Sequence, residues 1–262
     1  MLALIAGQGR LPKILVDSLS KRPEIASLQG FDPEGLIPDR QFRLETLGSL
    51  IAELKAAGTT EVCFAGAIAR PEVDPSALDA ATLPLVPRIM AALQMGDDAA
   101  LGTVLAIFEE ADIAIKAATD LVPTLLPEAG VLSKRPVEVT HEKDAKRART
   151  IAAALGELDL GQSCVVRKGQ ALALEALPGT DAMLGTLADA PHGSGGIFFK
   201  AKKPQQDARI DLPVIGVETV RNVAAAGLDG IVIQAGGVMV LDLDEVVQAV
   251  NDADLFFWIR DD

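Results

Sequence analysis

Residues 2–12 read LALIAGQGRLP, and the fold expected for the first half of the chain follows from these residues. Five apolar residues, Leu2 to Ala6, predict a buried strand. A Gly-Gln-Gly turn follows, and Pro12 falls in the first turn of the next helix, where proline is tolerated. A strand that passes through a glycine loop into a helix is typical of α/β proteins with a parallel sheet.

The same pattern continues along the first half. Leucine and isoleucine recur at helical spacing over residues 47–54, and the apolar strand EVCFA, residues 61–65, then leads into Gly66. Strand-helix-strand connections of this length favour a parallel sheet. We therefore predict a Rossmann-like domain in which the loops after residues 6 and 65 are neighbours at the carboxyl edge of the sheet.

Residues 121–139 follow neither the strand nor the helix period and contain Pro123, Pro127, Gly130 and Pro136, so the domain boundary is placed there. Beyond it, a helix over residues 141–158, a hairpin turning at Lys168-Gly169-Gln170 and further strands predict a mixed sheet. The predicted fold class is α/β. An N-terminal Rossmann-like parallel-sheet domain spans residues 1–130, and a C-terminal mixed-sheet α/β domain spans residues 131–262.

Composition excludes several classes of function. The net charge of -13 opposes binding to nucleic acid, and a chain without Tyr has few aromatic side chains for stacking on bases. We expect no transmembrane segment, because no window approaches the roughly 20 uncharged apolar residues that span a bilayer. Cys63 and Cys164 lie far apart in apolar runs, which predicts buried, reduced thiols and a cytoplasmic protein.

The Gly7-Gln8-Gly9 loop is a candidate phosphate site, because backbone N–H groups at the start of a helix bind anions. The dinucleotide fingerprint is incomplete: Pro12 stands at the third glycine position, and no clear strand-end acid follows about 20 residues later. A merely tight turn and a contact to phosphate or uridine both stay open. Ala65 and Gly66 end the second strand, so the two loops together predict a ligand crevice.

Other polar residues favour structural interpretations. Asp97-Asp98 could bind a ribose or a cation, but an acidic pair ahead of a helix is typical of an N-cap. His141 and His192 lack metal-ligand spacing and have polar neighbours in the sequence, which predicts that both are solvated. The basic cluster predicts an exposed helix face and consists of Lys143, Lys146, Arg147 and Arg149.

The segment with the most informative charges is residues 175–216, EALPGTDAMLGTLADAPHGSGGIFFKAKKPQQDARIDLPVIG. Cleaving a pyrophosphate with water requires cations that neutralise oxygen atoms, carboxylates that hold Mg²⁺ and an oriented nucleophile. Asp211 stands just before Leu212-Pro213, and the restricted backbone there predicts a fixed carboxylate at a strand end. Asp207 favours an Asx-turn, whereas Asp181 fits either an N-cap or a ligand.

Six segments resemble the UDP-2,3-diacylglucosamine pyrophosphatases of lipid A synthesis, the LpxI-type family. They occur in order across nearly the whole chain and read LIAGQGRLP, CFAGAIARP, DLGQSCVV, ALALEALPGTDAML, KKPQQDARIDLPVIG and AGLDGIVIQAGG. The chain departs from the family at Val214, where Thr is common, and around PHGSGGIFFK. The resemblance implies hydrolysis of UDP-2,3-diacylglucosamine to 2,3-diacylglucosamine 1-phosphate (lipid X) and UMP, using Mg²⁺, in the cytoplasm of a Gram-negative bacterium.

The resemblance also implies a site. The aspartate of the DLP motif is essential in that family, which makes Asp211 the predicted catalytic residue and, with Asp181, a predicted metal ligand. The glycine loops are expected to receive the uridine or ribose, and Lys203 and Gln206 the diphosphate. The predicted substrate-binding residues are Gly7, Gln8, Gly9, Ala65, Gly66, Asp97, Gln162, Thr180, Asp181, Lys203 and Gln206.

The expected partner is a UDP-linked lipid, and we also expect a homo-oligomer that makes transient contact with the inner membrane. Two alternatives remain. One is an NAD(P)-linked oxidoreductase that uses the first glycine loop, which the missing third glycine disfavours. The other is a non-catalytic nucleotide-sensing module, which would need the glycine loops but not a fixed carboxylate surrounded by cations. Asp211 distinguishes these classes.

Overall fold

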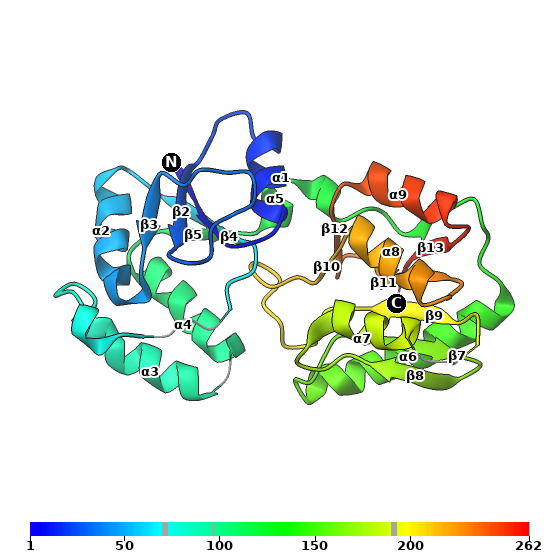
Figure 1. The fold of residues 1–262 in the computed structure, drawn as a ribbon. Coiled ribbons are helices and arrows are strands. Elements are labelled where there is room, and N and C mark those ends of the chain that lie inside the picture. The colour runs from blue at the N-terminus through cyan, green and yellow to red at the C-terminus, as the bar shows by residue number, and fades with distance from the viewer. Residues whose placement is uncertain (70–72, 96, 190–192, 262) are drawn as a thin grey trace. The chain divides into compact units, whose positions relative to one another are not determined.

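The computed structural model describes residues 1–69, 73–95, 97–189 and 193–261. The chain divides into two compact units, Met1–Pro123 and Thr124–Asp262. Each unit is an α/β structure with its own sheet (Figure 1). Among the described residues, no helix combines the length and apolar character that crossing a membrane requires.

The first unit contains a five-stranded sheet with the order β3-β2-β1-β4-β5. All neighbouring strands are parallel, as predicted for a Rossmann-like domain. The strands are β1 (Leu2–Ala6), β2 (Glu24–Leu28), β3 (Arg40–Phe42), β4 (Glu61–Ala65) and β5 (Ala114–Lys116). The strand order reverses between β1 and β4, and in open α/β sheets ligands bind beyond the carboxyl ends of the strands at such a point.

The helices of this unit are α1 (Leu11–Ser18), α2 (Leu47–Ala56), α3 (Val86–Met95), α4 (Asp97–Glu110) and the short α5 (Ala118–Leu121). The leucine and isoleucine residues of α2 are buried, as their spacing predicts. They share one core with Ile89 of α3, Phe108 of α4 and alternate residues of β1, such as Ala3 and Ile5. Helices α2, α3 and α4 therefore cover one face of the sheet.

Glu45 anchors the turn between β3 and α2. Its side chain is buried, and its carboxylate accepts hydrogen bonds from Nη2 of Arg43 (2.9 Å) and from the Asp74 amide (2.6 Å). These donors, Arg43 above all, lower the pKa of Glu45 to about 2. The ionised form of Glu45 thus stabilises the folded chain at neutral pH.

The second unit contains a six-stranded mixed sheet with the order β6-β13-β11-β9-β7-β8, which confirms the predicted mixed-sheet architecture. Its strands are β6 (Gly130–Val131), β7 (Ser163–Arg167), β8 (Gln170–Leu174), β9 (Ile197–Lys200), β11 (Gly230–Gln234) and β13 (Phe256–Arg260). Strands β9, β11 and β13 are parallel, whereas β6, β7 and β8 pair antiparallel. A separate parallel pair joins β10 (Val214–Ile215) to β12 (Met239–Val240).

The predicted hairpin is present as β7 and β8. Lys168 and Gly169 at its turn have φ values of 49° and 76°, the positive range that tight hairpin turns require. Their backbone amides donate to the buried carboxylate of Asp144, at 2.9 and 2.7 Å. Asp144 therefore fixes the turn against helix α6 (Val139–Glu157).

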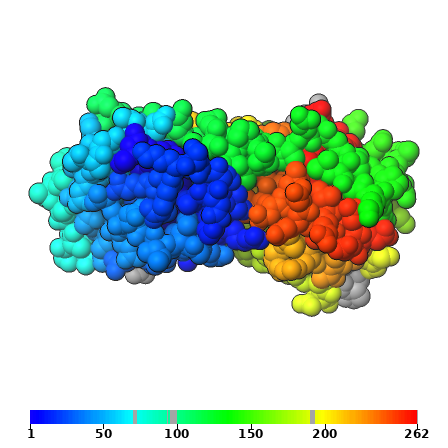
Figure 2. Space-filling view, turned by 90° about the horizontal axis from the view of Figure 1, so that it is seen from above, coloured from blue at the N-terminus to red at the C-terminus, as the bar shows by residue number. Residues whose placement is uncertain are grey.

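Helix α6 lies on one face of the second sheet, and α7 (Gly179–Ala188), α8 (Val217–Ala225) and α9 (Leu243–Asp252) lie on the other. Adjacent strand residues alternate between the two cores: Phe198 packs toward α7 and α8, and Phe199 packs toward α6. Figure 2 shows the surface of α9 in orange-red beside the green segment around Lys134, whose amide donates to Asn251 of α9 at 2.7 Å.

One sequence prediction in this unit is wrong. His141 is not solvated: it is 5% exposed, stacks on Phe256 with ring centroids 4.6 Å apart, and places Nε2 3.5 Å from Asp229 Oδ2. Its partners come from distant parts of the chain, so its local sequence did not reveal them. The prediction for the basic cluster is confirmed, because all four side chains are exposed. His192 lies outside the described residues.

Candidate functional site

The two glycine loops of the first unit are paired. The Gly7 amide donates to the Ala65 carbonyl (2.8 Å), and Gln8 and Ala67 exchange two backbone hydrogen bonds of 2.9 Å. The structure thus brings Gly7, Gln8, Ala65 and Gly66 together where β1 and β4 end. This is the edge at which the sequence predicts a ligand crevice.

The contact between the two loops is enough to explain why glycine occupies two of these positions, and no bound ligand is needed for that explanation. A Cβ atom on Gly7 would lie 2.6 Å from the Ala67 carbonyl oxygen, and one on Gly66 would lie 2.6 Å from the Gly7 carbonyl oxygen. Gly66 also has a φ of 93°, which favours glycine. Gly9 differs, because its φ is 91° but a Cβ atom there would have no neighbour within 4 Å. Gln8 is exposed, so Gln8 and Gly9 are the accessible part of the loop.

Strand β2 ends at Leu28 and not at an acid, in agreement with the sequence interpretation. Asp32 lies in the loop after this strand, and its Oδ1 accepts hydrogen bonds from Ser27 Oγ (3.0 Å) and Gln41 Nε2 (2.8 Å). These contacts hold the loop, and they give no support to a ribose-binding role. Asp97 begins α4, but its side chain lies outside the described part of the structure.

The second unit gathers polar side chains at the carboxyl edge of its sheet. Three parallel strands end in Lys200, Gln234 and Arg260, and the strand register makes them neighbours. Nη1 of Arg260 and Oε1 of Gln162 are buried and have no hydrogen-bond partner among the described residues. Such atoms retain the capacity to bind a ligand, and a guanidinium is well suited to a phosphate.

Lys200 forms the centre of a buried network. Its side chain is 6% exposed, and Nζ donates to Thr180 Oγ1 (2.9 Å) and to the Val214 carbonyl (3.3 Å). Thr180 in turn donates to Glu175 Oε1 at 3.0 Å, and the Gln162 amide donates to Oε2 of the same carboxylate at 3.2 Å. Burial lowers the pKa of Lys200, and the charges of Glu175 and Asp181 oppose this shift.

Asp211 belongs to a second hydrogen-bonded group. Nε2 of Gln206 donates to Asp211 Oδ2 at 2.5 Å, and Oε1 of Gln206 accepts from the Lys203 amide at 3.2 Å. Gln206 is buried, so the orientation of the Asp211 carboxylate is well determined. Within the described part of the chain, Oδ1 of Asp211 accepts no hydrogen bond. Three predicted site residues, Lys203, Gln206 and Asp211, therefore lie together.

Two neighbouring acids have clearer structural contacts. Asp207 accepts from the Arg209 amide at 3.0 Å, which confirms the Asx-turn, and Arg209 lowers the pKa of this carboxyl. Asp181 is not an N-cap, because it lies inside the first turn of α7. It is exposed and accepts from Asn222 Nδ2 at 2.9 Å.

Lys203 is already paired. Its Nζ lies 2.6 Å from Asp159 Oδ1, so a phosphate would have to compete with this carboxylate for the ammonium. Asp159 is the more exposed partner of the pair.

The oxygen donors suit Mg²⁺ better than a soft metal. Nowhere in the described ranges do three or more His, Cys, Asp or Glu side chains form a metal-binding group. Mg²⁺, however, is commonly held by one or two carboxylates, with phosphates and water completing its shell. The unpartnered Oδ1 of Asp211 is compatible with that mode of binding.

Sequence reasoning missed Glu175, Lys200, Gln234 and Arg260 as members of the site. One signal was available for three of them: each is the polar residue that ends an apolar strand, as in IFFK, GIVIQ and FFWIR. Parallel strand ends meet at one edge, where ligand sites are common. Applying that rule to the second half would have selected these residues.

The fold and the site define a class of protein. It is an α/β protein of two units, and in each unit a ligand can bind at the sheet edge where the parallel strands end. Comparison with known proteins gives the family. Residues 1–125 match the LpxI N-terminal domain and residues 128–258 match the LpxI C-terminal domain. The chain is 37% identical over 267 aligned residues to the UDP-2,3-diacylglucosamine pyrophosphatase LpxI of Caulobacter vibrioides, covering 97% of this chain and 95% of that protein. The chain belongs to the LpxI family.

Proposed function

We propose that this chain hydrolyses UDP-2,3-diacylglucosamine to 2,3-diacylglucosamine 1-phosphate and UMP in lipid A biosynthesis. The relative from Caulobacter vibrioides bears the name of that pyrophosphatase, and the likeness extends over both units. The observation that carries the proposal is the Asp211 carboxylate, which Gln206 holds while Oδ1 stays unpartnered among the described residues. No observation favours an oxidoreductase.

Asp211 acts on the water in this proposal. Its free carboxylate oxygen accepts a proton as the water oxygen bonds to one phosphorus and the anhydride P–O bond breaks. The departing phosphate becomes either UMP or the sugar phosphate, and both products form whichever phosphorus is attacked. Gln206 fixes the carboxylate, which lowers the cost of orienting it.

Cations in the second unit complement the diphosphate. Mg²⁺ would supply charge neutralisation when bound, and where Asp211 acts as a metal ligand rather than as the base, it would hold the ion with support from Asp181. Arg260 offers a guanidinium nitrogen that lacks a partner in the described structure. Lys200 is a positioning residue, because its ammonium links the start of α7 to Val214, three residues after Asp211. Gln8 and Gly9 are the proposed uridine contacts, since they are the accessible part of the loop.

The test compares Asp211→Asn with Asp207→Asn. Both substitutions remove one carboxylate from the same loop, and Asn can replace Asp in an Asx-turn. UMP release from UDP-2,3-diacylglucosamine should fall by about 10²–10⁴-fold for Asp211→Asn, the usual contribution of an acid–base group, and should change little for Asp207→Asn. Equal rates for the two folded variants would remove Asp211 from the mechanism.

The proposal includes dependence on Mg²⁺, transient contact with the inner membrane and a homo-oligomeric state. Exhaustive treatment with EDTA should abolish UMP release, and Mg²⁺ or Mn²⁺ should restore it, because oxygen ligands favour hard cations. Full activity in EDTA would contradict the metal requirement. It would leave the assignment of Asp211 as a base intact.

A further inference from the structure

Arg260, the last residue of β13, lies against the ring of Trp258. Cζ of Arg260 is 5.5 Å from the centroid of that ring, and the two residues are two positions apart, so both side chains project from one face of the sheet. Nη1 of Arg260 is buried and has no hydrogen-bond partner among the described residues. A buried cationic donor without an acceptor is costly, because its lost hydrogen bonds to water are not replaced. An anion bound at Nη1 would remove this cost.

Arg260 lies on the face of the second sheet that α6 covers. Phe256, four positions earlier in the same strand, packs against α6. Gln234 is the register partner of Arg260, so it shares this face. Lys200 differs, because its register partner is Ile233, which packs toward α7 and α8. Arg260 and Lys200 therefore lie on opposite faces of the sheet at one edge.

Hydrogen bonds connect the strand beside β13 to the segment that holds Asp211. Gln234 ends that strand, β11, and its Oε1 accepts from the Lys202 amide at 3.2 Å. Oε1 of Gln206 accepts from the next amide, that of Lys203, also at 3.2 Å, and Nε2 of Gln206 donates to Asp211. The guanidinium at the end of β13 is thus next to the point where this segment is attached to the sheet.

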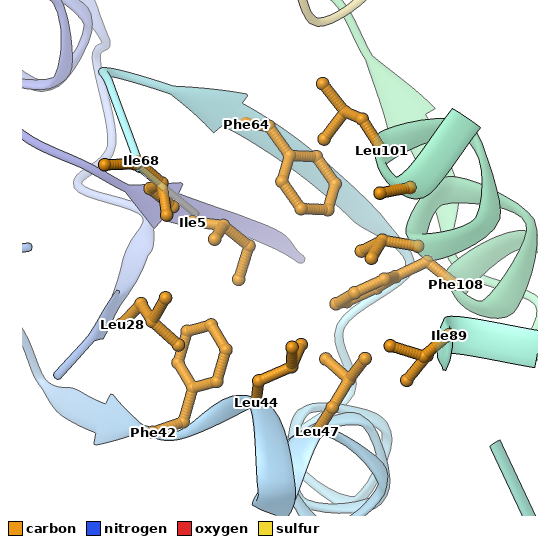
Figure 3. A pocket seen from close by; sticks show the side chains of 13 residues that line it. Ile5, Leu28, Phe42, Leu44, Leu47, Phe64, Ile68, Ile89, Leu101 and Phe108 are labelled. Atoms are coloured by element: carbon orange, nitrogen blue, oxygen red, sulfur yellow. The ribbon is translucent and has the colours of Figure 1, made fainter. Parts of the chain in front are cut away.

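The apolar cavity of the first unit offers no comparable donor. Figure 3 shows its walls, and every described residue that lines it is Ile, Leu, Phe, Val or Ala. A phosphate placed there would lose its hydrogen bonds to water and gain none. A guanidinium, in contrast, presents N–H groups in a planar geometry that fits phosphate oxygens. Of these two places, only the one at Arg260 suits a phosphate.

We propose that the Arg260 guanidinium binds a phosphate oxygen of the substrate and that Trp258 is the residue that positions it. The inference rests on the proposed function, because the name of the Caulobacter relative supplies a UDP-linked substrate. The indole face attracts the cation and restricts its side chain, so less conformational entropy is lost when the phosphate binds. Nη1 is covered in the structure, and a phosphate oxygen reaches it once the covering groups move aside, while the guanidinium stays on the indole.

The first experiment uses the fluorescence of Trp258. The chain contains one tryptophan and no tyrosine, so indole emission reports the surroundings of this residue alone. Inorganic pyrophosphate, titrated into the full chain, should change the emission in a saturable manner, because an anion at the guanidinium alters the charge beside the indole. Arg260→Met should remove this response.

Arg221→Met is the matched control. It removes the same charge, but Arg221 is exposed and pairs with Glu218 on α8, so the fluorescence response should be that of the wild type. Two results would overturn the anion site: a wild type that does not respond to pyrophosphate, or a folded Arg260→Met variant that responds as the wild type does.

A double-mutant cycle tests whether Trp258 acts through Arg260. A cation–π contact contributes about 2- to 30-fold to an equilibrium constant, so Trp258→Leu should weaken UDP binding, measured by calorimetry, by about that factor. Trp258→Phe keeps an aromatic face and should retain more of the affinity. In the Arg260→Met background, Trp258→Leu should have no further effect on UDP binding. An equal loss in both backgrounds would refute the positioning role and leave Trp258 a structural residue only.

Kinetics separate this inference from the proposed function. With UDP-2,3-diacylglucosamine, Arg260→Met should raise KM about 10- to 100-fold, the usual contribution of a hydrogen bond to a charged group. It should change kcat little, because the diphosphate already carries its charge in the ground state. UMP release with an unchanged KM in this variant would refute the anion site alone. If the wild type releases no UMP, yet its fluorescence response to pyrophosphate requires Arg260, the pyrophosphatase assignment is refuted and the anion site is retained.

Discussion

Replacing Lys200 by Met should destabilise the second unit strongly. Methionine matches the length of the lysine stem but removes the ammonium that contacts Thr180 and Val214. Lys200 Nζ and Glu175 Oε1 share Thr180 Oγ1 as a partner, at 2.9 and 3.0 Å, so the two charges are at most 5.9 Å apart. At an effective dielectric constant near 20, their attraction is about 3 kcal/mol.

Losing that attraction leaves the Glu175 carboxylate, 8% exposed, without its cation. The two charges are linked through Thr180 rather than in direct contact, and removing the buried ammonium also relieves the desolvation that lowers the pKa of Lys200, so about 3 kcal/mol is the upper bound of the expected loss. Thermal unfolding followed by circular dichroism should show a fall in Tm of roughly 6–12 °C for a loss of about 3 kcal/mol. Lys202→Met, two positions along and only half-buried, is the control and should change Tm little.

The double variant Lys200→Met with Glu175→Gln tests whether the attraction between Lys200 and Glu175 causes the loss of stability. Glutamine removes the unpaired negative charge: its single carbonyl oxygen can accept from the backbone amide of Gln162, and its NH₂ group can donate to Thr180 Oγ1, which Lys200 no longer contacts in this variant. The double variant should therefore be more stable than Lys200→Met alone, with a coupling energy of about 1–3 kcal/mol. If the two substitutions are simply additive, the electrostatic account of Lys200 is wrong and its role is only packing.

Three further predictions concern the first unit and the thiols. Gly66→Val should lower Tm much more than Gly58→Val does. Both glycines have a positive φ, but only at Gly66 would a Cβ atom meet backbone atoms, those of Gly7 and Gln8. Equal falls in Tm would show that this contact does not require glycine at position 66. Cys63 and Cys164 should resist iodoacetamide at pH 8 in the native protein, since burial raises the pKa of each thiol to about 12, and rapid carboxymethylation seen by mass spectrometry would contradict this. Glu45 has a pKa of about 2 in the folded protein, so its ionised carboxylate should add at most about 3 kcal/mol to the free energy of unfolding above pH 4.5, and progressively less as the pH falls toward 2. The difference in the free energy of unfolding between wild type and Glu45→Gln, measured with urea, should therefore disappear in acid.

Local pattern was sufficient for much of the fold. The predicted strands at residues 2–6 and 61–65 are confirmed, and so is the hairpin, because apolar runs next to glycine turns have few alternative structures. Strands β2 and β3 were not recognised. Strand β3 is three residues long and reads Arg-Gln-Phe, so it shows no alternation of apolar and polar residues. It is a strand because it pairs with β2.

The contacts of the candidate site were harder to predict from the sequence than the fold was. Asp211 and Gln206 are five residues apart and share one loop, so a short segment already contained both. Lys200 depends on Thr180, 20 residues earlier, and on Val214, 14 residues later. Their proximity requires the sheet and α7 to be assembled first. A motif within one short window of the sequence cannot reveal contacts between residues this far apart in the chain.

The glycine loops show how one residue pattern can support two explanations. Glycine at positions 7 and 66 is compatible with close approach of a phosphate, and equally with close approach of another backbone. The distances favour the second explanation at both positions, because the missing Cβ atoms would meet the partner loop. At Gly9 no such neighbour is within reach, and Gln8 beside it is exposed. Open space, rather than glycine content, identifies the part of this loop that a nucleotide can contact.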